Sequence, residues 1–243
     1  MRCGNIEYKY LKELRQDEFF GIRLPVDFNP PKTCSFNCVY CPLGNTTRQI
    51  MDREEFFPAE DIFREIYDYI EKNGEPDYVW LKGNGEPTLY SGFKRLTQLI
   101  IQNYPGLKIG SWLNGSLLYR EDVRSDFSIC DLIVLHLDSS TPKEFLKISR
   151  HHKDVKFYNV IEGIKLFKNN FKGRLGISTV FLRNINANEK NLKGLKELVL
   201  EISPDFYLIQ ESNDEKFKPL TEEFKAKIKE IFSDLPFQVR ILL

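Results

Sequence analysis

The chain has 243 residues, of which 42% are hydrophobic and 29% are charged, the ordinary balance of a soluble globular protein with one domain or a small pair. Lys plus Arg and Asp plus Glu number 35 each, so the overall charge does not favour nucleic acid as a partner, although a local basic run at 143–156 leaves one open. No apolar run reaches the ~20 residues that span a bilayer, and the charged N-terminus lacks a signal-peptide centre. We therefore expect a cytoplasmic protein without membrane contact.

Apolar residues alternate between strand and helix spacing along most of the chain. Residues 1–18 are a charged lead-in, and residues 19–243 are expected to form the main domain, which ends in a helix and a strand. In chain order the pattern predicts a strand at 19–28, a helix at 59–73, a strand at 77–83, a helix at 92–103, a strand at 107–115, a helix at 116–129 and a strand at 131–139. It then predicts helices near 142–149 and 157–169, a strand at 175–182, a helix at 188–203, a strand at 205–210, a helix at 219–233 and a strand at 237–243.

This alternation is typical of parallel strands joined by right-handed crossovers. Six or seven such units are fewer than the eight of a closed barrel. We therefore expect an α/β fold with an open, partial barrel, and a doubly wound sheet is the alternative from periodicity alone. In either fold, ligands lie at the carboxyl ends of the strands.

Three of the five cysteines, Cys34, Cys38 and Cys41, share the loop at 31–47 in a C-x3-C-x2-C spacing. Closely spaced thiolates favour a soft metal centre. A structural zinc site has four ligands, usually in two pairs, and a cubane iron–sulfur cluster is normally held by four thiolates. Cys3 and Cys130 are single and distant, and we interpret them as structural thiols. A zinc or disulfide loop is the alternative to a cluster with one open iron.

Polar residues also follow three later strands. After the strand at 77–83 comes Gly83-Asn84-Gly85-Glu86-Pro87, in which the glycines allow close backbone approach and Glu86 offers an acceptor for an ammonium group. Asn114 ends the third strand. On the fourth strand His136 and Asp138 share a face, because side chains alternate along a strand.

Several further residues are weaker candidates. Lys82 precedes the glycine turn, where it could neutralise a carboxylate or form a Schiff base, or else be an ordinary surface lysine. Polar residues at the ends of the last two internal strands are frequently just solvated: Ser178, Thr179, Gln210 and Glu211. No single catalytic residue is assigned, and Asp138, His136 and Lys82 are the candidates.

The three-cysteine spacing, with Tyr40 before the last cysteine, resembles the radical S-adenosylmethionine (SAM) superfamily. The resemblance implies a partial (β/α)6-type barrel in which Cys34, Cys38 and Cys41 hold a [4Fe-4S] cluster whose open iron binds SAM. It implies SAM contacts for Tyr40 near the adenine and for Asn84, Gly85 and Glu86 at the methionine amino group. Asn114 and Asp138 are further candidates for SAM binding.

The activity implied by the resemblance is reductive cleavage of SAM to a 5′-deoxyadenosyl radical, which abstracts hydrogen from an unidentified substrate. A one-electron donor such as flavodoxin or ferredoxin is implied as well. The chain looks like short Fe–S oxidoreductases related to the wyosine-forming tRNA enzymes, so modification of a tRNA base is one alternative. Those enzymes carry additional upstream cysteines, which Cys3 alone does not supply. A non-catalytic Fe–S or zinc binding module is the other alternative.

Overall fold

A single curved sheet organises the protein. The computed structural model describes residues 2–3, 6–212 and 214–243. The main sheet has eight strands in the order β12-β11-β10-β9-β8-β7-β4-β3. All neighbours pair in parallel except β3 and β4, which are antiparallel. The strands are β3 Arg15–Asp17, β4 Gly21–Val26, β7 Tyr78–Leu81, β8 Lys108–Leu113, β9 Leu132–His136, β10 Arg174–Phe181, β11 Phe206–Glu211 and β12 Gln238–Leu242.

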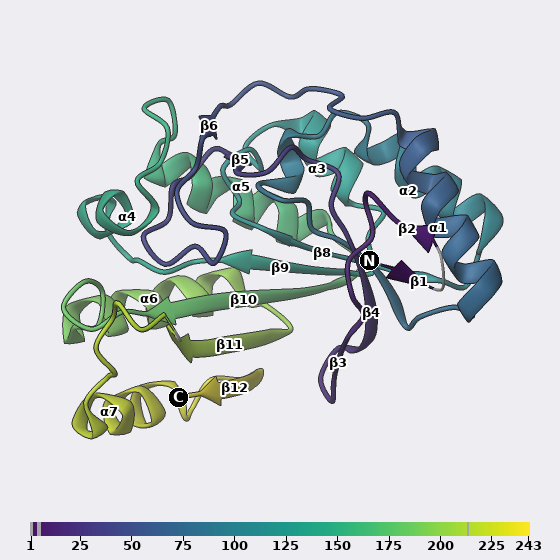
Figure 1. Ribbon diagram of the computed structural model, residues 1–243. Coiled ribbons are helices and arrows are strands. Elements are labelled where there is room, and N and C mark those ends of the chain that lie inside the picture. The colour runs from purple at the N-terminus through teal and green to yellow at the C-terminus, as the bar shows by residue number, and fades with distance from the viewer. Residues whose placement is uncertain (1, 4–5, 213) are drawn as a thin grey trace.

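Helices occupy the crossovers between successive parallel strands. They are α1 Ala59–Asn73, α2 Phe93–Asn103, α3 Glu121–Phe127, α4 Pro142–Ser149, α5 Phe157–Asn170, α6 Glu189–Ile202 and α7 Glu222–Phe232. Figure 1 shows α1, α2, α3 and α5 along one side of the curled sheet. The expected partial barrel is therefore confirmed, in preference to a doubly wound sheet. In the part of the chain that the structure describes, no helix has both the length and the apolar character that crossing a membrane requires.

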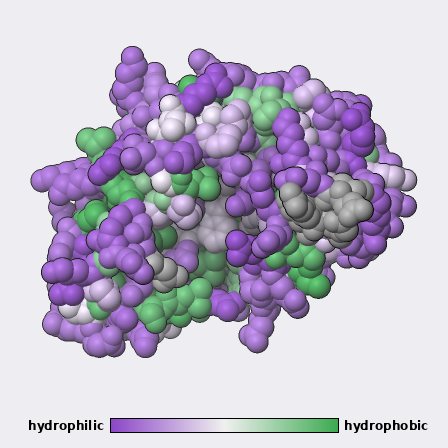
Figure 2. Space-filling model, viewed as in Figure 1, coloured by the Kyte–Doolittle hydropathy of each residue, from purple (hydrophilic) through white to green (hydrophobic). Residues whose placement is uncertain are grey.

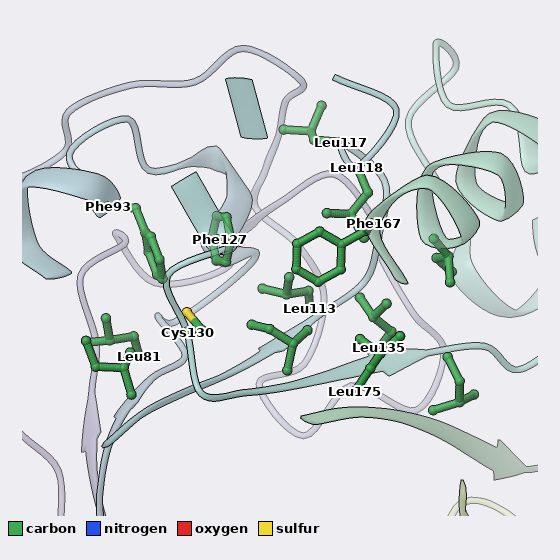
Figure 3. Packing of buried hydrophobic residues seen from close by; sticks show 14 of the residues in the cluster. Leu81, Phe93, Leu113, Leu117, Leu118, Phe127, Cys130, Leu135, Phe167 and Leu175 are labelled. Carbon is green, nitrogen blue, oxygen red and sulfur yellow. The ribbon is translucent and has the colours of Figure 1, made fainter. Parts of the chain in front are cut away.

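The larger hydrophobic core lies between the sheet and its helices. Along β9, Ile133 and Leu135 face this core, whereas Leu132 and Val134 belong to a smaller cluster on the other, inner face, as the two-residue period of a strand requires. Figure 3 shows Leu135 with side chains from neighbouring strands and helices in the larger core. The Phe93 and Phe127 rings of α2 and α3 stack there with centroids 3.8 Å apart.

Cys130 lies in the same core, labelled in Figure 3 among the apolar side chains, and is 3% exposed. Burial raises the pKa of this thiol well above its usual range. The position fits the structural role expected for Cys130. The side chain of Cys3 lies outside what the structure describes.

Several predicted elements are longer than the observed ones, and two of these differences have a clear local cause. The strand predicted at 19–28 is β4, Gly21–Val26, because Phe19 and Phe20 form a turn whose backbone N–H groups donate to Asp17 Oδ1 at 2.9 and 2.8 Å. The helix predicted at 116–129 is only α3, Glu121–Phe127. Gly115 has φ +77°, and the backbone N–H of Ser116 donates to Asn114 Oδ1 at 2.9 Å, so the segment before the helix is a turn.

Part of the lead-in packs against the main domain. Tyr8, Tyr10 and Leu11 are buried, and Leu11 forms an isolated antiparallel bridge to Val26 on β4. The backbone N–H of Tyr10 donates to Glu65 Oε2 on α1 at 2.8 Å. Before it, the short strands β1 Arg2–Cys3 and β2 Ile6–Glu7 pair with each other.

Candidate active site

The cysteine loop is fixed at both sides by backbone hydrogen bonds. Its first part, β5 Thr33–Cys34, pairs with β6 Arg48–Gln49. Between these strands the backbone N–H groups of Asn37 and Val39 donate to Ser149 O and Ile148 O, at 2.8 and 2.9 Å. These carbonyls are at the C-terminus of α4, where the helix leaves acceptors unpaired. The loop and α4 therefore satisfy each other's backbone groups.

The glycine turn after β7 holds the same loop from the other side. The backbone N–H of Glu86 donates to Thr33 O at 3.0 Å, and that of Lys32 donates to Asn84 O at 2.7 Å. A Cβ atom on Gly85 would lie 1.7 Å from Thr33 O, so only glycine fits there. The close backbone approach expected of this turn is thus an approach to the cysteine loop.

Glu86 places a buried carboxylate beside the loop. The residue is 2% exposed and caps the short 3-10 helix η1, Pro87–Leu89. Its Oε1 accepts a hydrogen bond from Thr88 Oγ1 at 2.7 Å, and its Oε2 accepts one from the Asn114 backbone N–H at 2.9 Å. Burial raises the pKa of this carboxyl to about 7.

Asn114 joins the end of β8 to the first cysteine. Its Nδ2 donates to Ser35 Oγ at 2.9 Å and lies 3.6 Å from Cys34 Sγ, which also accepts from it. Ser35 Oγ and Ser116 Oγ share a further hydrogen bond of 2.7 Å. Both serines were missed from the sequence, where their positions next to Cys34 and after Asn114-Gly115 were the only signal.

The end of β9 supplies the opposite wall. Asp138 Oδ2 accepts a hydrogen bond from the Tyr40 hydroxyl at 2.5 Å, and its Oδ1 accepts one from the Val180 backbone N–H at 2.7 Å. Burial raises the pKa of Asp138 to about 6. Burial and the neighbouring Asp138 raise the pKa of Tyr40 well above its usual range.

His136, the last residue of β9, is half-buried beside two aromatic rings. Its ring centroid lies 5.4 Å from that of Trp112 and 6.3 Å from that of Tyr40. Among the described residues its Nδ1 has no hydrogen-bond partner. Burial lowers its pKa to about 4, so the imidazole is neutral near pH 7.

The three loop thiols border one cavity of about 360 Å³, which we call the cofactor cavity. Burial, with Glu86 nearby, raises the pKa of Cys34 to about 12, and burial also raises the pKa of Cys38. Thiols in such surroundings ionise when a metal centre binds them. In the described ranges, no three His, Cys, Asp or Glu side chains converge as ligands of a single ion would. A cubane cluster spreads its thiolates over separate irons, which fits three thiols that border one cavity.

Most residues predicted from the sequence meet at this cavity. Its lining includes Cys34, Cys38, Tyr40, Cys41, Lys82, Gly85, Glu86, Asn114, His136 and Asp138. Asn84 lines an adjoining cavity instead. Thr179 bonds to Tyr207 in the core, Ser178 to Gln210, and Glu211 pairs with Lys225, so these weaker candidates lie outside the lining.

Several lining residues were not predicted from the sequence, among them two tryptophans. Trp80 and Trp112 stand two positions before Lys82 and Asn114, on the same faces of β7 and β8. That spacing was the available signal. Figure 2, with the viewpoint of Figure 1, shows a hollow over the middle of β9 and β10, with hydrophilic and hydrophobic side chains around it.

Comparisons with known proteins identify the family and the fold of this chain. Residues 28–194 match the Radical SAM superfamily. A UPF0026 protein of Methanocaldococcus jannaschii is 33% identical over 221 residues, which cover 88% of this chain and 68% of that protein. A Brachyspira hyodysenteriae protein described as GTPase Obg is 32% identical over 216 residues, covering 87% of this chain. The chain spans only 32% of the length of that second relative.

Among solved structures, a radical SAM methyltransferase from Sphaerobacter thermophilus superposes with a TM-score of 0.66 at 14% identity, covering 90% of this chain and 66% of that one. At this identity the superposition shows a shared fold. The family match covers more than half of the chain and includes the cysteine loop, the glycine turn and the end of β9. This chain belongs to the radical SAM superfamily and, within it, to the UPF0026 proteins.

Proposed function

We propose that this chain is an enzyme that cleaves SAM reductively and uses the resulting 5′-deoxyadenosyl radical to abstract hydrogen from a substrate. One observation carries the proposal. Three thiols from one loop, the buried Glu86 and the half-buried Asp138 border the same cavity at the carboxyl ends of parallel strands. The superfamily's [4Fe-4S] cluster and SAM are the cofactors that supply the radical chemistry.

The chain's own residues would bind and orient these cofactors. Cys34, Cys38 and Cys41 supply three thiolates for four irons, which leaves one iron for SAM. Glu86 is the acceptor for the SAM amino group, and its hydrogen bond from the Asn114 backbone fixes its position. Asp138 and Tyr40 hold each other at the far wall, with Asn114 beside Cys34.

We propose two kinds of partner for this activity. The electron comes from an external one-electron donor such as flavodoxin or ferredoxin. A substrate occupies the barrel beside the cofactors. A tRNA substrate stays a prediction, which the basic run at 143–156, largely α4 and the turn after it, makes testable by RNA retention that weakens with salt.

The test is anaerobic reconstitution with iron and sulfide, followed by dithionite, SAM and an assay for 5′-deoxyadenosine. We expect the wild-type chain to form a four-iron cluster and to release 5′-deoxyadenosine, and Cys38→Ser to do neither. Cys130→Ala is the matched control, because that thiol lies in the core away from the cavity. A cluster that neither binds nor cleaves SAM would reduce the protein to an electron carrier or a binding module.

A further inference from the structure

A second cavity, of about 720 Å³, adjoins the cofactor cavity, and we call it the basic cavity. Small-molecule sites have volumes of about 300–1,000 Å³. Trp80, Lys82 and Trp112 line both cavities, so a molecule in one touches side chains that also border the other. The rest of the lining comes mainly from the lead-in and β4: Lys12, Glu13, Arg15, Arg23, Pro25 and Asp27.

Basic side chains outnumber acidic ones around the basic cavity. Lys12, Arg15, Arg23 and Lys82 face Glu13 and Asp27, which is four cations against two carboxyl groups. Lys12 pairs with Asp27 at 3.6 Å, and Arg23 pairs with Asp17. Within the described residues, Arg15 and Lys82 form no ion pair. Unpaired cations beside a cavity favour an anionic ligand.

Lys82 lies where it could hold an anion next to the cofactor cavity. It follows β7 and borders both cavities, and it is half-buried rather than free in solvent. Asp27 attracts Lys82 electrostatically but forms its ion pair with Lys12 at 3.6 Å, and burial is the main cause of the raised pKa of Asp27. The ammonium group of Lys82 is therefore available to a ligand.

Two tryptophans also line the basic cavity. The Trp80 and Trp112 ring centroids lie 6.4 Å apart, and Trp80 is 4% exposed. A Cβ atom on Gly110 would lie 2.4 Å from the Trp80 ring, so a glycine on β8 leaves room for the indole on the inner face. In the described part of the chain, the buried Trp112 Nε1 has no acceptor. A ligand acceptor would recover the cost of that unmade hydrogen bond.

We propose that the basic cavity binds the substrate, and that the substrate is a small organic anion with a planar ring. Its carboxylate or phosphate pairs with Lys82, and its ring lies against Trp80 and Trp112. This inference rests on the proposed function, because it makes the adjoining cofactor cavity the source of the radical. It assigns Lys82 to substrate binding rather than to a Schiff base.

The chain offers a direct reporter, because Trp80 and Trp112 are its only two tryptophans. The experiment titrates reconstituted protein with benzoate and phenyl phosphate, follows tryptophan fluorescence, and checks occupancy by equilibrium dialysis. Benzamide is the neutral probe of matched shape. We expect saturable binding of at least one anion, at least tenfold tighter than that of benzamide, and the tighter anion identifies carboxylate or phosphate.

Variants locate the binding. Lys82→Met should lower the affinity for the anion at least tenfold, whereas Lys82→Arg should keep that affinity within about threefold. The control Lys147→Met, on the exposed side of α4, should leave the affinity unchanged. If Lys82→Met does not fold, Arg15→Met tests the second cation of the basic cavity that forms no ion pair among the described residues, and it should also lower the affinity for the anion. Equal binding of benzamide and the anions, or affinity indifferent to both cation variants, would overturn the inference. The binding experiment does not require turnover, so it can fail independently of the SAM-cleavage assay. SAM cleavage without a preference for the anions would contradict this inference alone. Anion binding without SAM cleavage would contradict the proposed function alone.

Discussion

Glu86 and Asn114 are joined by a hydrogen bond from the Asn114 backbone N–H to Glu86 Oε2 at 2.9 Å, across 28 residues of sequence. The bond ties the residues that follow β7 to those that follow β8. The other carboxylate oxygen is occupied by the hydroxyl and backbone N–H of Thr88. Glu86 therefore shapes the cavity wall as well as offering charge to a ligand.

Replacing Glu86 should affect both stability and SAM affinity. Glu86→Ala leaves buried donors unpaired, so we expect the free energy of unfolding of the cofactor-free protein to fall by about 1–3 kcal/mol. It should also weaken SAM binding to the reconstituted protein while the cluster is kept. Urea unfolding and equilibrium dialysis measure the two effects, with exposed Glu197→Ala as the control. Unchanged SAM affinity would remove Glu86 from its proposed role.

Asn114 should tune the cluster. Its Nδ2 donates to Cys34 Sγ at 3.6 Å. A donor to a cluster ligand stabilises the reduced, more negative state and raises the reduction potential. We expect Asn114→Ala to retain iron but to lower that potential in a potentiometric titration followed by electron paramagnetic resonance. Asn103→Ala, on the exposed surface of α2, is the control, and a potential equal to that of the wild type would show that the bond has no effect.

Local sequence patterns predicted the elements whose structure depends on residues close together in the sequence. The helix predicted at 59–73 is α1, because its apolar residues recur at helical spacing and Gly74, with φ +84°, ends it by donating to Ile70 O at 2.8 Å. The cysteine loop was recognisable because its three thiols lie within eight residues of sequence. Both signals depend on neighbours along the chain.

Contacts between distant segments were not predictable in the same way. Ser35 and Ser116 share a hydrogen bond across 81 residues of sequence, and the residues next to either serine do not predict this contact. Phe19 and Phe20 have the composition of a strand, but they turn so that Phe20 packs against Trp80 at 5.5 Å. Thr179 lies near the carboxyl end of β10, where ligand contacts were expected, but its hydroxyl donates to Leu137 O in the core at 2.5 Å. Tertiary packing decided all three.

Arg53 should be a major determinant of stability. Its side chain is 9% exposed, pairs with Asp126 at 2.6 Å and Asp122 at 3.1 Å, and donates to Thr88 O and Tyr90 O. Arg53→Met leaves Asp126 without its cation and two carbonyls without donors. We expect a loss of about 3–5 kcal/mol, which lowers Tm by at least about 6 °C. Calorimetry checks this against Arg64→Met, 75% exposed, which should cost less than about 0.5 kcal/mol; equal losses would contradict the role of Arg53.

His136 and Asp138 should give the cofactor-free protein two opposed pH dependences. Burial lowers the pKa of His136 from 6.5 to about 4, so between these values the unfolded chain binds a proton that the folded chain does not. The His136 contribution to stability is therefore lost as pH falls through that window. Burial raises the pKa of Asp138 from 3.8 to about 6, so the folded chain keeps a proton that the unfolded chain releases. Its contribution is lost as pH rises.

Single variants separate these two effects. His136→Phe should reduce the loss of stability between pH 6.5 and pH 4 by up to about 3 kcal/mol, because no imidazole remains to titrate. Asp138→Asn should reduce, by a similar amount, the loss between pH 4 and pH 6. Urea unfolding of the cofactor-free proteins at half-unit steps gives the difference from the wild type at each pH. Because the predicted differences have opposite slopes, curves that run parallel to that of the wild type would show that neither group is shifted by burial.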